Sequence, residues 1–244
     1  MANPALSEKA FDYAIKNSNE ETMTINGAIN KAIILSLILM LSALVSVYFV
    51  LEKNLELLYP AVIVSSIGAV ILAIIMAFKK ETAKTLSILY AILEGIAIGG
   101  ISFVFNAVYD GIVVQAVFFT SADLLVMLLL YKFRIIKVND KFRSVIFGAT
   151  LCIAIVYLIN FILGFFKMSV PFLNDSSPIG IGISVAIVAI ASFNLLLDFD
   201  FIEQGANANM PKYFEWYCAF GLLVTLVWLY LEILRLLSKV RSRD

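Results

Sequence analysis

The chain alternates long apolar runs with short polar connections. Seven of these runs are close to the ~20 residues that an α-helix needs to cross about 30 Å of hydrocarbon. They lie at 32–51, 58–78, 86–106, 112–131, 144–166, 178–197 and 216–237. No internal repeat or low-complexity stretch interrupts them. The pattern therefore predicts an all-α fold, a polytopic membrane bundle of seven transmembrane helices occupying residues 32–237.

Two polar segments flank this predicted bundle. Residues 1–31 contain no apolar run of signal-peptide length, so we expect the first span to act as an uncleaved anchor. Within this N-terminal arm, Ser7 is placed to cap a short amphipathic helix that carries Phe11 and Ile15 on its apolar side. We expect that helix to lie on the membrane surface. Residues 238–244 form a basic C-terminal tail.

The composition supports a lipid bilayer as the surroundings of most of the chain. Hydrophobic residues make up 62%, charged residues 15%, and the mean hydropathy is +0.97. Soluble domains carry about 45–50% apolar and about 25% charged residues. A net charge of zero argues against a nucleic-acid partner.

Residue usage also narrows the chemistry. The chain has no histidine, the commonest metal ligand and general base, so proton chemistry must rest on carboxylates. Cys152 and Cys218 lie singly in apolar runs and are interpreted as core residues. No nucleotide-binding or hydrolase motif is present. We therefore expect neither an enzyme nor a protein with a bound cofactor.

Basic residues in the loops predict the orientation. Only Lys53 and Lys167 lie in the loops on one side, whereas twelve lie on the side of the N-terminus, namely Lys9, Lys16, Lys31, Lys79, Lys80, Lys84, Lys132, Arg134, Lys137, Lys141, Arg143 and Lys212. The N-terminus should thus be cytoplasmic. Seven crossings would place the basic C-terminal residues on the opposite side, against the same rule. Either the earlier loops outweigh this tail or the last segment does not cross; its length and apolarity favour seven spans.

Two acids fall near the middle of predicted spans. Glu94 lies in the third run and Asp123 in the fourth. An ionisable group within a membrane is a functional hypothesis by default, so both are candidates for an ion pathway. The alternative for Glu94 is structural hydrogen bonding between helices that glycines such as Gly99 allow to pack closely. For Asp123, the hydroxyls of Thr120 and Ser121 or a neighbouring helix offer structural partners.

Three acids end the sixth run: Asp198, Asp200 and Glu203. Asp198 and Asp200 are two residues apart and point to different helix faces, so at most one of them should face the bundle interior. A solvated acidic helix end is the alternative, although acids there oppose the helix macrodipole. Lys79 and Lys80 end the second run on the same side and are natural partners.

The last run carries two further acids. Glu232 and Arg235 are spaced i, i+3 and are interpreted as a local ion pair. Glu215 precedes the run, where an acid complements the macrodipole of the helix that follows. Both acids are kept as candidates for the ion pathway.

Four stretches carry a family resemblance. They are NPALSEKAF at 3–11, YAILEGIAIGGIS at 90–102, LLLDFDFIEQG at 195–205 and EWYCAFGLLVTLVWLYLEILRLL at 215–237. With the seven-span pattern, they make the chain resemble the Bax inhibitor-1 family, in particular its bacterial branch. The resemblance implies a central last helix wrapped by the other six. It also implies a passive, pH-sensitive calcium leak in a bacterial plasma membrane.

The resemblance also implies a gate. In the family's bacterial calcium-leak members, one aspartate near the cytoplasmic end of the sixth helix shares a proton with another on the last helix. Asp198 matches the first aspartate, but Thr225 stands at the position of the second. The basic residue that latches the first aspartate corresponds to Lys80, or to Lys79 if the register differs by one.

This departure predicts a modified pH sensor. Two close carboxylates cannot easily both ionise, and a threonine removes that coupling. We expect Asp198 to be latched by Lys80, with any second acid supplied by Asp200, Glu94 or Glu215. Asp198 and Glu94 are the expected calcium ligands, since carboxylates bind this hard cation.

Two other functions stay open at this point. The chain could be a membrane interaction protein that binds other membrane proteins, such as a membrane protease, without transport. It could also be a proton-coupled transporter of small solutes in which Glu94 or Asp123 relays the proton.

Overall fold

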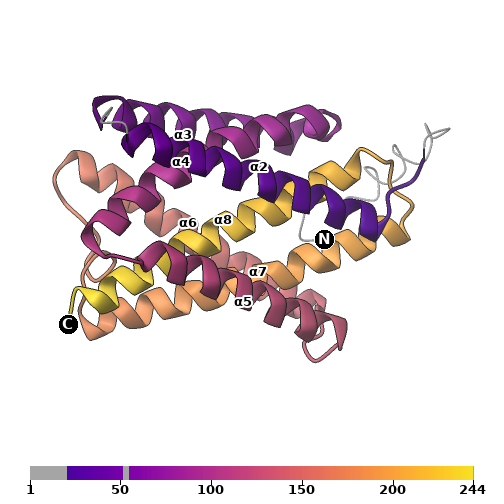
Figure 1. The fold of residues 1–244 in the computed structure, drawn as a ribbon. Helices are drawn as coiled ribbons and strands as arrows, with labels where there is room; N and C mark the ends of the chain where they lie inside the picture. The colour runs from indigo at the N-terminus through magenta and orange to yellow at the C-terminus, as the bar shows by residue number, and fades with distance from the viewer. Residues whose placement is uncertain (1–20, 52–54, 244) are drawn as a thin grey trace. The chain divides into compact units, whose positions relative to one another are not determined.

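The computed structural model describes residues 21–51 and 55–243, and this part of the chain is built from helices. The elements in order are α2 (Ile25–Leu51), α3 (Leu55–Phe78), the short 3₁₀ helix η2 (Lys80–Thr82), α4 (Ala83–Val108), α5 (Ile112–Lys132), α6 (Asp140–Phe165), α7 (Pro178–Asn207) and α8 (Phe214–Arg241) (Figure 1). Seven of them are long and apolar enough to cross a membrane. The predicted all-α fold with seven spans is confirmed. The amphipathic helix predicted at Ser7 lies outside the described residues.

Local hydrogen bonds explain where the helices begin. Asn139 accepts a hydrogen bond from the backbone N–H of Phe142 at 2.8 Å and caps α6. Ser177 accepts one from Gly180 at 3.1 Å, and Pro178 takes the first position of α7, where its missing N–H costs nothing. The residues that fix where α6 and α7 begin therefore lie within a few positions of each start in the sequence.

Several helix boundaries differ from those of the apolar runs, and the start of α2 and the end of α7 differ most. Helix α2 starts at Ile25, inside the segment expected to be an arm, because the Thr24 hydroxyl caps it by accepting a hydrogen bond from Gly27 at 2.9 Å. Helix α7 continues past the end of its apolar run to Asn207. The acids of this region therefore lie along α7 rather than at its end.

The chain divides into two compact units. The first comprises Met1–Ala107 with Asp200–Val224, and the second comprises Val108–Phe199 with Thr225–Asp244. Helices α7 and α8 thus contribute to both units. Each unit is described by itself below.

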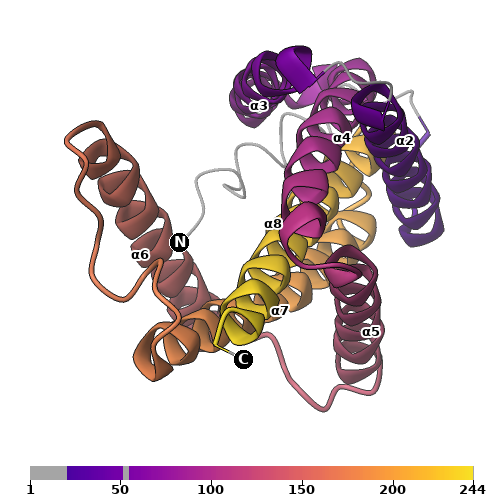
Figure 2. The ribbon, with the colours of Figure 1, turned by 60° about the vertical axis from the view of Figure 1, so that its left-hand side comes forward.

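In the first unit, α2 and α4 pack closely through glycine (Figure 2). A Cβ atom at Gly99 would lie 2.5 Å from the carbonyl oxygen of Ala43, and one at Gly95 would lie 2.7 Å from the Cβ of Ser42. Only glycine permits this approach of the two helices, as the sequence suggested. Tyr90 of α4 meets Phe220 of α8 edge to face, with ring centroids 5.0 Å apart.

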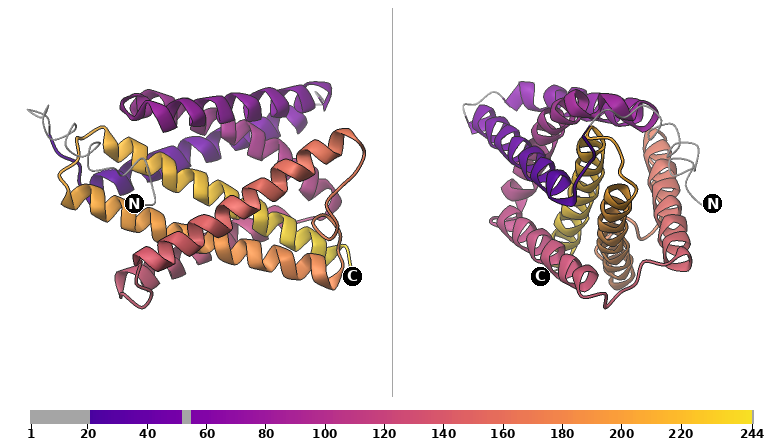
Figure 3. Two further views of the ribbon diagram at one scale, coloured as in Figure 1. Left: turned by 180° about the vertical axis from the view of Figure 1, so that it is seen from behind. Right: turned by 90° about the vertical axis from the view of Figure 1, so that its right-hand side faces the viewer.

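In the second unit, α7 lies between α5 and α6 (Figure 3), and aromatic pairs join it to both. Phe199 meets Tyr131 of α5 at 5.9 Å between centroids, and Phe193 meets Phe142 of α6 at 5.8 Å. Most of α6 is exposed, with Phe161 65% accessible. Such apolar exposure is stable when lipid is the solvent.

Helix α8 is the most buried of the described spans. Its apolar window is 56% buried, against 6% for α6. It contacts α4 in the first unit through Phe220, and α7 in the second unit through Lys239. α8 thus packs against another helix within each unit.

Candidate functional site

Helix α7 carries a series of polar side chains in the second unit, each bonded to a different neighbour. Ser184 accepts a hydrogen bond from Lys239 of α8 at 2.8 Å, and Asn194 donates one to Thr150 of α6 at 2.8 Å. Further hydrogen bonds join Ser192 to Asp123 and Asp198 to Thr225. A spanning helix with this many polar contacts is the best candidate for the lining of an ion pathway.

Asp198 has one bonded and one unbonded oxygen. The hydroxyl of Thr225 donates a hydrogen bond to the carboxyl group. The other oxygen, Oδ2, is buried and has no hydrogen-bond partner among the described residues. The structure thus brings together the two positions that the family resemblance pairs, with a hydroxyl in place of the second acid.

Asp123 of α5 shares this arrangement. A hydrogen bond joins it to Ser192 of α7, and its Oδ2 is buried without a partner in the part of the chain that the structure describes. The neighbour Thr120 donates its hydroxyl hydrogen to the carbonyl of Ala116 at 2.8 Å instead. Asp123 is therefore satisfied from another helix, and only in part. A buried oxygen without a partner costs about 1–3 kcal/mol.

Asp200 lies two residues beyond Asp198 and belongs to the first unit. Its Oδ2 accepts a hydrogen bond from Gln204, one turn further along α7, at 2.6 Å. Asp198 is instead bonded to α8 through Thr225. The two aspartates thus have different surroundings, as expected from their spacing. Glu203 is partly exposed on the same helix.

Lys80 begins η2 in the first unit and lies against aromatic rings of α8. Its Nζ is 5.9 Å from the centroid of Phe214 and 5.4 Å from that of Tyr217, within cation–π range. Lys79 precedes η2, and its carbonyl accepts the Thr82 hydroxyl at 2.6 Å. The predicted latch joins residues of two different units, so it stays a prediction.

Glu94 is partly buried on α4, one turn after Tyr90, in the first unit. Asp198 belongs to the second unit, so the expectation that these two acids bind calcium together stays a prediction. Among the described residues, no group of three or more Asp, Glu, Cys or His side chains gathers to hold a metal ion.

Glu215 is fully buried in the first turn of α8 and is held by two lysines. Lys31 Nζ lies 2.9 Å and Lys212 Nζ 3.2 Å from its carboxylate oxygens. The backbone N–H of Thr24 donates to the same carboxylate at 3.0 Å. These contacts match the structural interpretation of Glu215, because its charge is balanced and its carboxylate helps to cap α2.

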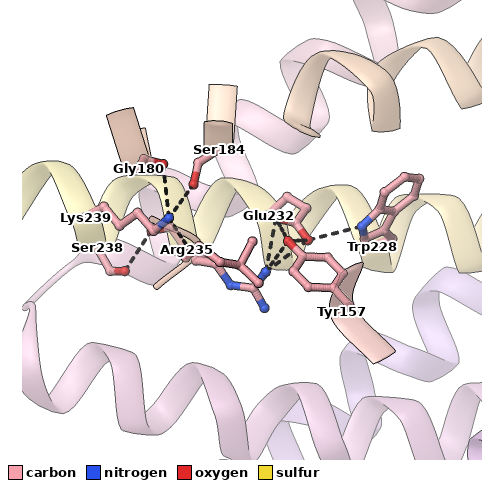
Figure 4. A network of polar contacts seen from close by, with 9 residues as sticks. Tyr157, Gly180, Ser184, Trp228, Glu232, Arg235, Ser238 and Lys239 are labelled. Carbon is pink, nitrogen blue, oxygen red and sulfur yellow. Dashed lines mark hydrogen bonds and ion pairs between the residues drawn. The ribbon is translucent and has the colours of Figure 1, made fainter. Parts of the chain in front are cut away.

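Glu232 is buried on α8 and lies at the centre of a polar network (Figure 4). The Tyr157 hydroxyl reaches its two oxygens at 2.8 and 2.9 Å, and Trp228 Nε1 donates to it at 3.2 Å. Arg235 Nη1 lies 3.2 Å from Glu232 Oε1, so the predicted ion pair is present. Sequence reasoning did not find Tyr157 and Trp228, because aromatic residues in apolar runs look like packing.

Lys239 is the charged residue that sequence reasoning missed. The sequence predicts that it lies in a basic C-terminal tail, but α8 continues to Arg241. Lys239 is only 4% exposed and donates to the carbonyl of Leu173 at 2.7 Å, to that of Gly180 at 3.1 Å and to Ser184 at 2.8 Å. Its spacing of four residues from Arg235 and seven from Glu232 places all three on one helix face. That spacing was the available signal.

These contacts bear on the basic residues near the C-terminus. Arg235 is paired with Glu232, Lys239 is buried, and Arg241 donates to the carbonyl of Asp110 at 2.6 Å. Three of the four basic residues that conflict with the charge rule are thus bound to the protein. They are poor indicators of the side of the membrane, because the rule concerns charges in loops.

A comparison with protein families agrees with the sequence motifs. A family model described as Bax inhibitor 1 like matches residues 3–242, nearly the whole chain. No curated protein and no solved structure matches the chain significantly.

Proposed function

The chain belongs to the Bax inhibitor-1-like family, and on this premise we propose that it is a pH-sensitive passive leak for cations, with calcium as the permeant ion. It works in a bacterial plasma membrane with its N-terminus in the cytoplasm. It performs no covalent chemistry and holds no cofactor. In this proposal, a hydrated cation exchanges its water ligands for protein oxygens as it crosses the membrane, and a change in pH stops this permeation.

The half-bonded carboxyl of Asp198 carries this proposal. Thr225 satisfies one side of the group, whereas the buried Oδ2 has no partner among the described residues. In a membrane-spanning segment, such an oxygen is stabilised by a proton or by a cation. Both bind the same atom, so they compete. This competition makes occupancy by the cation depend on pH.

Asp123 supplies a second oxygen of the same kind in the second unit. It is bonded to Ser192, which lies six residues before Asp198 on α7, a rise of about 9 Å along a helix. Carboxylate oxygens are the ligands that calcium prefers. Two partial sites along one helix suit conduction, because each binds the ion weakly enough to release it.

The gate uses one acid and one hydroxyl. Acidification protonates Asp198, removes its negative charge and weakens any ion pair with Lys80. Because Thr225 cannot ionise, the sensor titrates as a single group rather than as a coupled pair. The expected pH response is therefore a simple one-proton curve.

The test is calcium uptake into liposomes that contain the purified protein, compared with empty liposomes at about pH 6 and about pH 8. Uptake above the empty control that differs between the two pH values supports the leak. Absence of uptake at both pH values, from protein shown to be folded, contradicts it. The interaction-protein interpretation would then take precedence, with Asp198 as a structural acid.

A further inference from the structure

Lys239 is a buried cation whose direct ligands are all uncharged. Its Nζ is surrounded by the carbonyl oxygens of Leu173 and Gly180 and by the hydroxyl of Ser184, at 2.7 to 3.1 Å. The structure gives it no ion pair within the described residues. The charged groups that act on it from further away are Asp175, Glu232 and Arg235. We call the three oxygen ligands the Lys239 cage.

Contacts of the loop before α7 position the oxygens of the Lys239 cage, in addition to their hydrogen bonds with the lysine. The Asp175 carboxylate accepts the Ser177 hydroxyl at 2.7 Å, and Leu173 is buried. The loop rests directly on Gly180, where a Cβ atom would lie 2.5 Å from the Asp175 carbonyl oxygen. The oxygens are thus positioned by local contacts, which is a requirement for a binding site with a fixed shape.

The Lys239 cage and Asp198 lie along the same pair of helices. Ser184 contacts Lys239, and Asp198 contacts Thr225. Fourteen residues separate the two contacts on each helix, from 184 to 198 and from 225 to 239. α7 and α8 therefore keep one antiparallel register, and the cage is about 21 Å from the acid along α7.

Two carbonyls and a hydroxyl are ligands for an ammonium or alkali-metal ion, whereas calcium prefers several carboxylates. A buried lysine without a carboxylate partner is costly unless its hydrogen bonds are fully satisfied. We propose that Lys239 is a tethered cation that fills a monovalent-cation site and closes the end of the α7–α8 contact opposite Asp198. The closing role rests on the proposed leak, but the site does not. A fixed positive charge there repels any cation that travels along α7.

Chemical rescue tests the site. Lys239→Ala removes three carbons and the ammonium group, and n-propylammonium replaces those atoms. We expect the melting temperature of the variant in detergent to fall by roughly 5 °C, because the cage oxygens lose their donor. Millimolar n-propylammonium should restore most of this loss, whereas n-propanol should not. Equal effects of the amine and the alcohol, or no rescue, would overturn the site.

The matched control is Arg241→Ala, which removes a neighbouring cation that donates to the Asp110 carbonyl outside the cage. Its melting temperature should not respond to n-propylammonium. A response as large as that of Lys239→Ala would show general stabilisation by the amine and would also overturn the site.

A second measurement covers the case in which Lys239→Ala does not fold. Gly180→Ala keeps the lysine but pushes the loop away from α7, so Lys239 should be acylated by an amine-reactive reagent roughly tenfold faster than in the wild type. Gly182→Ala, on the same helix with open space around the added methyl group, is the control and should match the wild type. Equal rates in all three proteins, measured by mass spectrometry, would contradict the cage.

Cation flux in liposomes tests the closing role of Lys239 separately from the proposed leak. In liposomes, Lys239→Ala should pass cations several-fold faster than the wild type, and n-propylammonium should reverse the increase. Unchanged flux together with successful rescue of stability would contradict the closing role. Absence of flux in the wild type would contradict the proposed function, whereas the rescue experiment would still decide whether the Lys239 cage binds a cation.

Discussion

At the residue scale, one hydroxyl distinguishes this chain from the two-acid gate that its family resemblance implies. Thr225 donates a hydrogen bond to Asp198, and the second oxygen of Asp198 is left without a partner in the described part of the chain. A hydroxyl donor stabilises the ionised acid without adding a second titrating group. The position therefore controls how steeply and at which pH the site responds.

Thr225→Asp should move the pH response of calcium flux. Two carboxylates in contact cannot easily both ionise, so one proton stays bound to a higher pH. We expect the midpoint of the flux curve to rise by about one pH unit or more. Thr225→Ser keeps the hydroxyl donor to Asp198 without adding a second acid, so it should leave the midpoint near that of the wild type. A midpoint that is unchanged in Thr225→Asp would argue against contact between these positions in the working protein.

Some of these residues could be predicted from the sequence and others could not. Asp123 and Asp198 are visible because an acid in an apolar run is costly and demands a reason. The role of Lys239 could not be predicted, because it follows the last apolar run, where a lysine usually lies in solvent. Nor could that of Tyr157, because a tyrosine in an apolar run looks like a packing residue until the structure places Glu232 beside it.

At the element scale, Glu215 fastens the start of α8 to the start of α2. Its carboxylate binds Lys31 and Lys212 and accepts the N–H of Thr24. The segment before α2 also pairs with the loop before α8, since Met23 donates to the Met210 carbonyl at 2.7 Å. The contact ties two helix starts that are far apart in the chain.

Glu215→Gln should destabilise the protein. The substitution leaves two lysines without their counter-charge, and because both lysines are partly exposed we expect a loss of about 2 kcal/mol, below the range for a fully buried pair. The melting temperature should fall by roughly 4–8 °C.

Glu21→Gln is the matched control for this loss. Glu21 is 84% exposed and lies 3.8 Å from Lys212, so its charge should contribute little. Similar melting temperatures for the two variants would mean that Glu215 does not hold the helix starts together.

The helices themselves were largely predictable, because a run of about 20 apolar residues has few alternatives to a spanning helix. Two ends in particular were not. Helix α2 begins early because the Thr24 hydroxyl caps it, and Thr24 in turn donates its backbone N–H to Glu215, which is far away in the sequence. Helix α7 continues beyond its apolar run, and there Gln204 donates a hydrogen bond to Asp200 one turn earlier. Hydropathy does not describe these contacts.

At the scale of the whole molecule, seven crossings would place the two termini on opposite sides of the membrane. The predicted orientation puts the N-terminus in the cytoplasm, on the strength of the loop lysines and arginines. The basic residues near the C-terminus do not oppose it strongly, because Lys239 and Arg241 are bound to other parts of the second unit. The burial of α8 agrees with a full crossing.

Thiol labelling in intact cells should show this topology. In a background with Cys152→Ser and Cys218→Ser, a cysteine introduced by Ser242→Cys should react with an impermeant maleimide from outside. A cysteine introduced by Lys79→Cys should react only after the cells are opened. Labelling of both from the same side would contradict seven crossings with a cytoplasmic N-terminus.

Competition between a proton and a cation for Asp198 is tested by calcium flux into liposomes across a pH series, measured for the wild type and for Asp198→Asn. Asp200→Asn, whose side chain bonds along its own helix, is the matched control. We expect Asp198→Asn to flatten the pH dependence of flux and Asp200→Asn to preserve it. A pH profile of Asp198→Asn that superimposes on that of the wild type would contradict competition at Asp198.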